Sequence, residues 1–228
     1  MPADATQDAH GHRQRLRQRF LESGGKGMPD YEMLELVLMG AIGRRDVKPL
    51  AKRLIKVFGS YEGALTAPPE RLREVEGLGE VAVALLKAVE ASAVRLAQAK
   101  VIGKPVISNW QALIDYCHAA MAHAPREQFR ILFLDCKNRL IADEVQQTGT
   151  VDHTPVYPRE VMRRALELSA SALILVHNHP SGDPTPSRGD IEMTKEIADA
   201  AYKLSISLHD HLVIGKQEHI SFKTLGLL

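Results

Sequence analysis

The hydrophobic pattern of the chain changes character once, at the Gly- and Pro-containing joint Val101–Pro105. Before this joint, from Arg13 to Leu96, apolar residues recur at three- and four-residue spacing, which is typical of amphipathic helices. Alternation of β-branched residues is absent there, so the pattern predicts an all-α region. After the joint, helical segments alternate with short apolar strands, which predicts an α/β or α+β domain with helices packed on one sheet. We therefore predict two domains, 1–100 and 101–228.

Within each half, Gly and Pro residues punctuate the predicted elements. Helices are predicted in the first half over Tyr31–Met39, Pro49–Phe58, Pro69–Val75 and Val81–Leu96. Helices are predicted in the second half over about Asn109–His123, Pro158–Leu168 and about Ser187–Leu204. Strands are predicted over Phe129–Leu134, Leu140–Gln146, Ala172–Val176 and Leu208–Ile214, the first two forming a hairpin. Residues 1–12 are polar, and we expect them to be disordered.

Composition excludes several classes of protein. Hydrophobic residues make up 45% and charged residues 25% of the chain, which is ordinary for a globular protein. The sequence contains no run approaching the roughly 20 apolar residues of a transmembrane helix, and its N-terminus lacks the apolar core of a secretory signal. Cys117 and Cys136 are far apart and form no CxxC pair, which argues against a disulfide framework. We expect a cytoplasmic protein without membrane contact, and a homo-oligomer is compatible with this composition.

The charge of the chain is nearly balanced, at +1 overall. Residues 1–100 hold 16 Lys/Arg and 13 Asp/Glu, whereas residues 101–228 hold 13 and 15. This asymmetry is far weaker than the basic surface of a dedicated nucleic-acid binder. Four arginines stand at every second position near the start, and we interpret them as a solvated charged stretch. They are Arg13, Arg15, Arg17 and Arg19.

The most informative segment runs from His177 to Asp190, directly after the predicted buried strand Ala172–Val176. Residues i and i+2 of an extended segment point to the same side, so His177 and His179 can present two imidazoles to one point. Zinc accepts such nitrogen ligands together with a carboxylate, which Asp190 supplies if the Pro-rich loop returns the chain. Three protein ligands leave the fourth position to water, which is the arrangement of a catalytic zinc site.

Two other patterns qualify this interpretation. Ser187 and Asp190 fit the first turn of a helix, where a serine cap and an acidic residue are favoured. Both interpretations can hold together, because a cap fixes the turn that aims the ligand. A second His-x-His pair, His209 and His211, lies on the last predicted strand. Since no third ligand is evident near it, we interpret this pair as structural or as support for the site.

The combination of His-x-His with Ser-x-x-Asp resembles the signature of JAMM (MPN+) metalloproteases. The longer segment HNHPSGDPTPS over 177–187, together with Asp210-His211, is similar to the RadC family, and the resemblance covers nearly the whole chain. It implies a JAMM/MPN-like mixed sheet with flanking helices, a Zn²⁺ cofactor and hydrolysis of a peptide or isopeptide bond in a protein substrate. Ser187 is implied to hydrogen-bond the oxyanion of the tetrahedral intermediate. The implied zinc ligands are His177, His179 and Asp190.

The resemblance also implies a glutamate that acts through the bound water, first as general base and then as general acid. The family places this residue just before the strand that follows the first helix of the domain, which is where Glu127 stands. Glu144 and Glu160 are rival candidates. We expect Glu127 to be the base.

The helical half contains a segment, Leu72–Leu86, that resembles a helix-hairpin-helix, with Gly77 and Gly79 in its turn. Such a turn can offer backbone N–H groups to a DNA phosphate. Glu76 and Glu80 flank the turn and repel phosphate, so a hairpin that serves packing alone and a weak DNA contact both remain open. The alternative function is accordingly that of a DNA repair or recombination factor whose metal site acts on nucleic acid or a DNA-bound protein. A non-enzymatic scaffold is disfavoured by the complete set of ligands.

Overall fold

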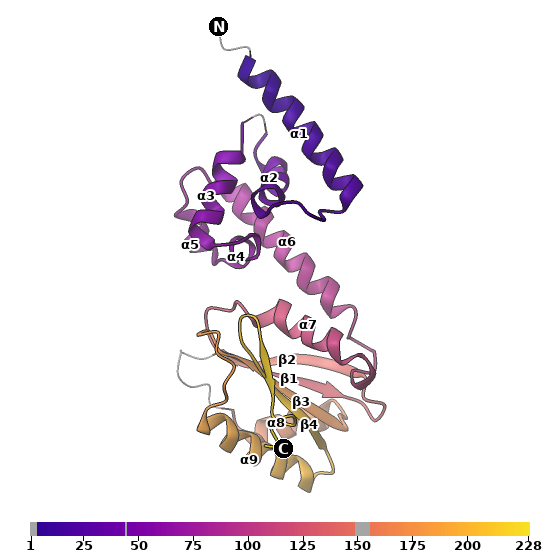
Figure 1. Cartoon of the computed structure of the whole chain (residues 1–228). Helices are drawn as coiled ribbons and strands as arrows, with labels where there is room; N and C mark the ends of the chain where they lie inside the picture. The colour runs from indigo at the N-terminus through magenta and orange to yellow at the C-terminus, as the bar shows by residue number, and fades with distance from the viewer. Residues whose placement is uncertain (1–3, 44, 149–155) are drawn as a thin grey trace. The chain divides into compact units, whose positions relative to one another are not determined.

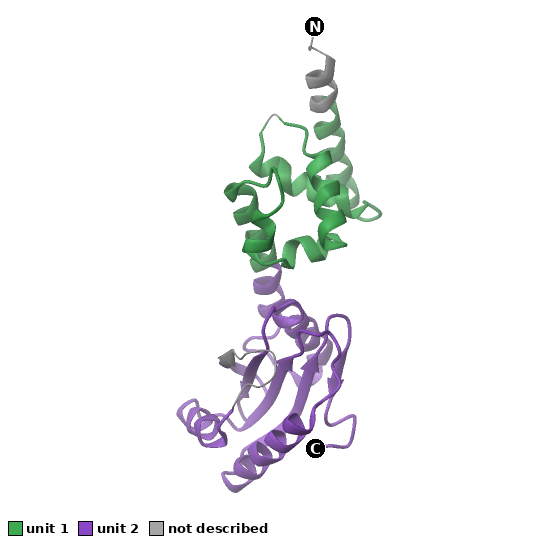
Figure 2. Cartoon of the chain, turned by 90° about the vertical axis from the view of Figure 1, so that its left-hand side faces the viewer, with its two compact units in different colours: residues 1–92 green, residues 93–228 purple. Residues whose placement is uncertain are grey.

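The computed structural model describes residues 4–43, 45–148 and 156–228. The chain divides into two compact units, residues 1–92 and 93–228 (Figure 2). The division falls inside helix α6 (Glu80–Gln98), which continues almost to the Gly- and Pro-containing joint. None of the helices in the described ranges has the length and apolar content that a membrane span requires.

The first unit is entirely helical in its described residues. Its elements are α1 (Asp4–Ser23), α2 (Asp30–Ala41), α3 (Lys48–Phe58), α4 (Tyr61–Thr66), α5 (Pro69–Arg73) and the beginning of α6. They enclose an aliphatic core in which Leu34, Leu54 and Leu86 are fully buried. The short helix α4 was not among the predicted elements, because six residues are too few to show a helical period.

The structure differs from the prediction of a disordered segment over residues 1–12. Helix α1 begins at Asp4, and residues 1–3 lie outside the described residues. Polar contacts attach this helix to its neighbours: His12 Nε2 lies 2.7 Å from Glu35 Oε2, and Arg13 donates to the carbonyl of Ile42 at 3.0 Å. Leu16 of this helix is also buried. The helical pattern predicted from Arg13 onward therefore holds for the second part of α1, and only the expectation of disorder before it is wrong.

The second unit is built on a five-stranded mixed sheet of order β2-β1-β3-β4-β5. Strand β1 pairs antiparallel with β2 and β3, β3 pairs parallel with β4, and β5 pairs antiparallel with β4. The strands are β1 (Gln128–Leu134), β2 (Leu140–Thr148), β3 (Ala172–Asn178), β4 (Ser207–Ile214) and β5 (His219–Ser221). The flanking helices are η1 (Ile107–Asn109), α7 (Trp110–Met121), α8 (Pro158–Glu167) and α9 (Arg188–Lys203). This mixed sheet with flanking helices, after an all-α region, confirms the predicted fold class.

Helices cover both faces of the sheet, α7 on one side and α8 and α9 on the other (Figure 1). Alternate residues of β1 serve the two layers: Leu132 packs in the core with α7, and Ile131 packs in the core with α8 and α9. Every residue of β3 is buried, so this strand lies at the centre of the unit. The functional site begins at the C-terminal end of β3.

A β-bulge interrupts the pairing of β3 with β4. Leu173 lies opposite Leu208 whereas Ile174 lies opposite Asp210, so His209 is the extra residue. Because side chains alternate between the faces of a strand, one extra residue moves those after it to the opposite face. His211 therefore lies opposite Leu175 and shares the face of Leu173 and Leu175.

Candidate metal centre

Three side chains converge where β3 ends and α9 begins. The Nε2 atoms of His177 and His179 lie 3.0 Å apart. Asp190, in the first turn of α9, places Oδ1 3.4 Å from His177 Nε2 and Oδ2 3.7 Å from His179 Nε2. One ligand atom from each residue lies within 4.8 Å of the others. The structure thus brings together the three residues that the sequence suggests as zinc ligands.

The remaining ring nitrogen of each histidine is engaged away from this point. His179 Nδ1 donates to the carbonyl of Asp183 at 2.8 Å. His177 Nδ1 lies 2.8 Å from Nε2 of His211, and both of these side chains are buried. Since neutral imidazole has one protonated nitrogen, donation from His179 Nδ1 leaves its Nε2 with a free electron pair for a metal.

Backbone hydrogen bonds hold the loop between His179 and Asp190 against the end of β4. His179 N donates to the carbonyl of Ile214 at 3.0 Å, and Lys216 N donates to the carbonyl of Gly182 at 3.3 Å. Gly215 permits this approach, because a Cβ atom there would lie 2.4 Å from the Gly182 oxygen. Together with Pro180, Pro184 and Pro186, these contacts restrict the loop that returns the chain to Asp190.

A capping box at the start of α9 orients the carboxylate ligand. The Asp190 N–H donates to Ser187 Oγ at 3.2 Å, and the Ser187 N–H donates to Asp190 Oδ2 at 2.7 Å. The Ser187 hydroxyl also donates to Oδ2, at 2.7 Å. Asp190 Oδ1 is thereby left facing His177. The predicted helix cap at Ser187 is present, and it holds the carboxylate toward the histidines.

The charges of the cluster favour an ionised carboxylate. Burial opposes ionisation of Asp190, but the adjacent imidazoles of His177 and His179 hold the pKa of this carboxyl well below its usual range. The neighbouring Asp190 carboxylate raises the pKa of His179 in turn, and the charge of Glu127 acts in the same direction. Burial lowers the pKa of His211 well below its ordinary value, so this imidazole is neutral.

The three candidate glutamates occupy different surroundings. Glu127 is half-buried just before β1, two residues from Phe129, which pairs with His177 in the sheet. Glu144 on β2 accepts from Arg164 at 2.8 Å. Glu160 on α8 accepts from Arg163 at 3.0 Å and is therefore occupied in a second ion pair. The charge of Glu127 acts on His179 of the cluster.

Comparison with known proteins agrees with this geometry. A family model described as the RadC-like JAB domain matches residues 107–227. The chain belongs to the RadC family. Among curated proteins, a UPF0758 protein of Rhodobacter capsulatus is 66% identical over 213 residues, which cover 93% of this chain and 100% of that protein. A UPF0758 protein of Ruegeria pomeroyi is 60% identical over 217 residues, which cover 95% and 97% of the two chains.

Membership of the RadC family places the second unit in a class of JAMM-type, metal-dependent hydrolases. The matched range includes every residue of the cluster as well as Glu127 and Ser187. It begins at η1 and therefore leaves the helical unit outside the match.

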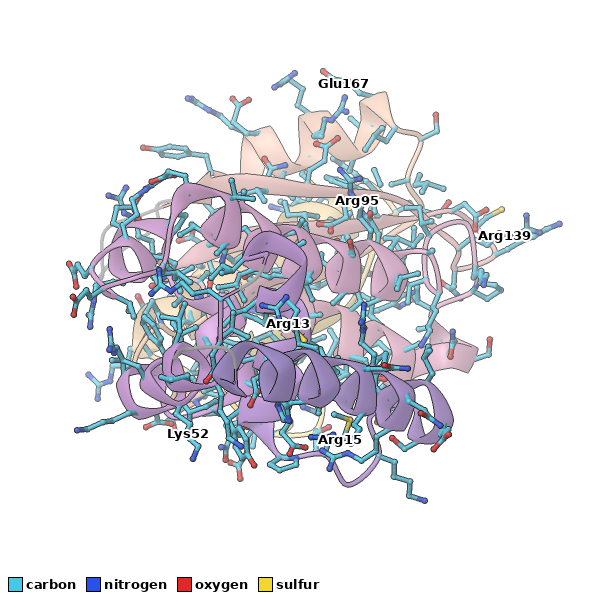
Figure 3. The ribbon with its side chains drawn as sticks, turned by 90° about the horizontal axis from the view of Figure 1, so that it is seen from above. Arg13, Arg15, Lys52, Arg95, Arg139 and Glu167 are labelled. Atoms are coloured by element: carbon cyan, nitrogen blue, oxygen red, sulfur yellow. The ribbon has the colours of Figure 1, made fainter. Side chains whose placement is uncertain are left out.

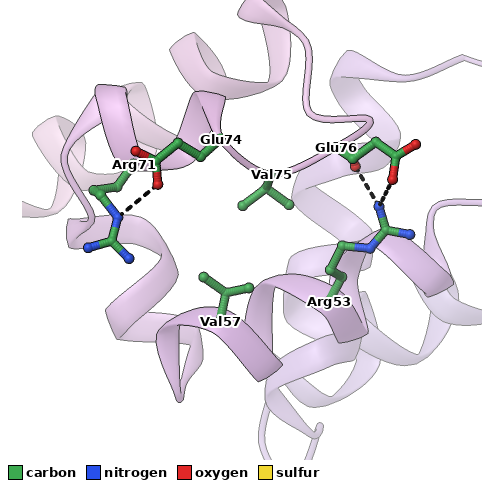
Figure 4. A pocket seen from close by; sticks show the side chains of 6 residues that line it. All are labelled: Arg53, Val57, Arg71, Glu74, Val75 and Glu76. Carbon is green, nitrogen blue, oxygen red and sulfur yellow. Dashed lines mark hydrogen bonds and ion pairs between the residues drawn. The ribbon is translucent and has the colours of Figure 1, made fainter.

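The predicted turn between α5 and α6 is present in this RadC family chain. Gly77 has a φ of +89°, and Gly79 accepts the first hydrogen bonds of α6 from Ala82 and Val83. An open pocket lies beside the turn (Figure 4). It is lined by Arg53, Val57, Arg71, Glu74, Val75 and Glu76. Both arginines of the pocket are engaged with its glutamates, at 3.1 Å for Arg71 with Glu74 and 3.5 Å for Arg53 with Glu76.

The arginine run lies along α1 and does not form a single stripe. Figure 3 shows Arg13 and Arg15 leaving α1 on different sides, as residues two apart on a helix do. Arg13 donates to the carbonyls of Ile42 and Arg45, at 3.0 and 2.5 Å. Arg19 pairs with Glu32. Two of the four arginines thus attach α1 to neighbouring segments, a role that the sequence interpretation as a solvated stretch did not include.

Sequence reasoning also missed a residue at the site. Thr194 is buried on α9, and its hydroxyl lies 2.6 Å from Nδ1 of His211. The available signal was its position four residues after Asp190, which puts both on one face of a helix. The second His-x-His pair separates: His211 contacts His177, whereas His209 Nε2 lies 2.6 Å from Asn138 Oδ1. The expected supporting role thus belongs to His211 alone.

Proposed function

We propose that the second unit is a zinc-dependent hydrolase that cleaves amide bonds in peptide or isopeptide substrates. The observation that carries the proposal is the convergence of two imidazole Nε2 atoms, 3.0 Å apart, on the Asp190 carboxylate. Two nitrogens and one carboxylate oxygen are a preferred ligand set for zinc, and three protein ligands keep one position open. The fit is supported by the engagement of both Nδ1 atoms elsewhere, which leaves the Nε2 atoms for the metal.

The protein residues supply the proton transfers around the metal. When bound, zinc lowers the pKa of water from about 15.7 toward 7 and polarises the substrate carbonyl. Glu127 is half-buried just before β1, and its charge acts on His179 of the cluster, so we assign it the proton of the attacking water. It returns this proton to the leaving amine, which completes cleavage of the amide bond.

Ser187 is assigned the role of oxyanion donor. Its side chain is exposed at the start of α9, beside the ligand Asp190. On substrate binding its hydroxyl proton turns from Asp190 Oδ2 to the developing oxyanion, and such a donor contributes about 3 kcal/mol to transition-state stabilisation. The backbone half of the capping box keeps Asp190 in place during this change, since the Ser187 N–H also donates to Oδ2.

The experiment that tests the proposal is a substrate screen with the zinc-loaded full chain. Its arms are unstructured peptides, isopeptide-linked peptides, and single- and double-stranded nucleic acid, each compared with the same protein after chelation. We expect zinc-dependent cleavage in a peptide or isopeptide arm. Cleavage confined to nucleic acid would replace this proposal with the alternative of a DNA-associated factor.

A further inference from the structure

A chain of hydrogen bonds runs behind the metal centre from one ligand to another. His177 Nδ1 lies 2.8 Å from His211 Nε2, and His211 Nδ1 lies 2.6 Å from Thr194 Oγ1. Thr194 Oγ1 lies 2.5 Å from the main-chain carbonyl oxygen of Asp190. His177 and His211 are 0% exposed and Thr194 is 1% exposed, so these polar groups depend on one another for partners.

The hydrogen bond between Thr194 and the Asp190 carbonyl determines the direction of the other two. A carbonyl oxygen can only accept, so the single hydroxyl proton of Thr194 is donated to Asp190. Thr194 Oγ1 must then accept from His211, which places the His211 proton on Nδ1. His211 Nε2 is left unprotonated and accepts from Nδ1 of His177. The Nε2 atom of His177 consequently carries a free electron pair, as a metal ligand requires.

The bulge in β4 is what brings His211 into this chain. Without the extra residue His209, the alternation of β4 places His211 on the sheet face away from His177. The carboxylate of Asp210 stabilises the local conformation by accepting from His211 N at 2.8 Å and from Lys223 N at 3.0 Å. Bulges that redirect a side chain are frequent beside active sites.

Aromatic rings restrict the two imidazoles from the sides. Phe222 packs against His211 with ring centroids 4.5 Å apart, and its N–H donates to the His211 carbonyl at 3.0 Å. Phe129 stacks on His177, with centroids 6.2 Å apart and planes inclined by 14°. Phe129 also meets His211 edge-on, at 5.6 Å. Rotation of either imidazole out of the hydrogen-bonded chain therefore requires displacement of a buried phenylalanine.

We propose that His211 and Thr194 are positioning residues that hold His177 in the tautomer with a free Nε2 atom and couple it to Asp190. The proposal rests on the proposed function for the identity of the metal, whereas the tautomers belong to the metal-free protein. Outer partners of metal-binding histidines typically contribute about 10–100-fold to metal affinity. We assign that contribution here to His211 and Thr194.

The zinc affinity of Thr194 variants, measured by competition with a chromophoric chelator, tests whether the hydrogen bonds of Thr194 support the metal centre. Thr194→Val keeps the shape of the side chain but can neither donate to Asp190 nor accept from His211. We expect it to weaken zinc binding by about tenfold, at the lower end of the range for outer partners. Thr194→Ser keeps the hydroxyl and should bind zinc like the wild type. Equal losses in the two variants, or no loss in either, would overturn the proposal.

Two variants of His211 provide an independent test. The amide oxygen of His211→Gln can accept from His177 Nδ1, whereas His211→Leu cannot. We expect His211→Leu to weaken zinc binding by up to about 100-fold and His211→Gln to recover part of that affinity. The melting temperatures of the metal-free variants show whether a loss of zinc affinity comes from the missing hydrogen bond or from a general loss of stability. If affinity follows the melting temperature alone, His211 is a structural residue and the proposal fails.

The tautomers are read directly by two-bond ¹H–¹⁵N correlation spectra of the metal-free full chain at a pH where the imidazoles are neutral. We expect the proton on Nδ1 in both His177 and His211. A proton on Nε2 of His211 contradicts the proposed direction of the hydrogen bonds. Because this measurement needs no metal, it decides the proposal even if the wild-type protein fails to bind zinc, a result that would refute the proposed function instead.

Discussion

The two His-x-His pairs lie on neighbouring parallel strands, β3 and β4, yet they are used differently. His177 lies in β3 and His179 follows its last residue, and both imidazoles face Asp190. The bulge at His209 breaks the alternation of β4, which separates His209 from His211. In this chain the His-x-His pattern brings two imidazoles beside a carboxylate on β3, whereas the bulge prevents the same arrangement on β4.

The largest expected effect is on catalysis by the site of the first pair, since the charge of Glu127 acts on His179. Glu127→Gln preserves the shape of the side chain but cannot accept a proton. We expect turnover on the substrate found by the screen to fall by about 10²–10⁴-fold while zinc stays bound. Steady-state kinetics and zinc content are measured on the same preparations.

Glu144→Gln and Glu160→Gln are the matched controls for this change, since their carboxylates are paired with Arg164 and Arg163. Both variants should retain most of the turnover. Near-native turnover in Glu127→Gln, together with loss in either control at full zinc content, would assign the base elsewhere.

A smaller effect is expected where the end of β4 supports the loop of the first pair. In Gly215→Ala the new methyl group meets the Gly182 oxygen at 2.4 Å and Pro184 Cδ at 3.0 Å, so the loop must move. We expect zinc affinity to fall by about tenfold, as for other changes behind the ligands. Chelator competition measures this loss. Gly43→Ala, where a Cβ meets no atom within 4 Å, is the control and should bind zinc normally.

The smallest effect is expected at the other member of the second pair. His209→Ala removes a hydrogen bond to Asn138 and should lower the free energy of unfolding by about 1 kcal/mol. Urea denaturation of the metal-free protein measures it. Zinc content should not change, because His209 does not belong to the cluster. Loss of zinc from this variant would contradict the claim that only the first His-x-His pair binds the metal.

Much of the fold could be predicted because buried strands and amphipathic helices leave a period in the sequence. The predicted strand Phe129–Leu134 differs from β1 by one residue, and the predicted helix Pro158–Leu168 differs from α8 by one. Strand β5 has only three residues, too few for a period to show. Helix α1 begins well before Arg13, and the polar residues there have no hydrophobic spacing from which a helix could be predicted.

The candidate site could be predicted as far as local spacing determines geometry. His177 and His179 are two residues apart on an extended segment, and Asp190 is aimed by a cap that the sequence also indicates. The role of His211 depends on a single extra residue in β4, which alters the pairing of strands without altering the composition. Thr194 is recognisable only once His211 is known to face it.

The most direct test of the metal centre is the zinc content of three purified full-length proteins by mass spectrometry. They are the wild type, His177→Ala/His179→Ala and His209→Ala. If the first pair and Asp190 hold the metal, the wild type and His209→Ala should contain about one zinc per chain, and the double variant should contain none. Stoichiometric zinc in the double variant would contradict the assignment.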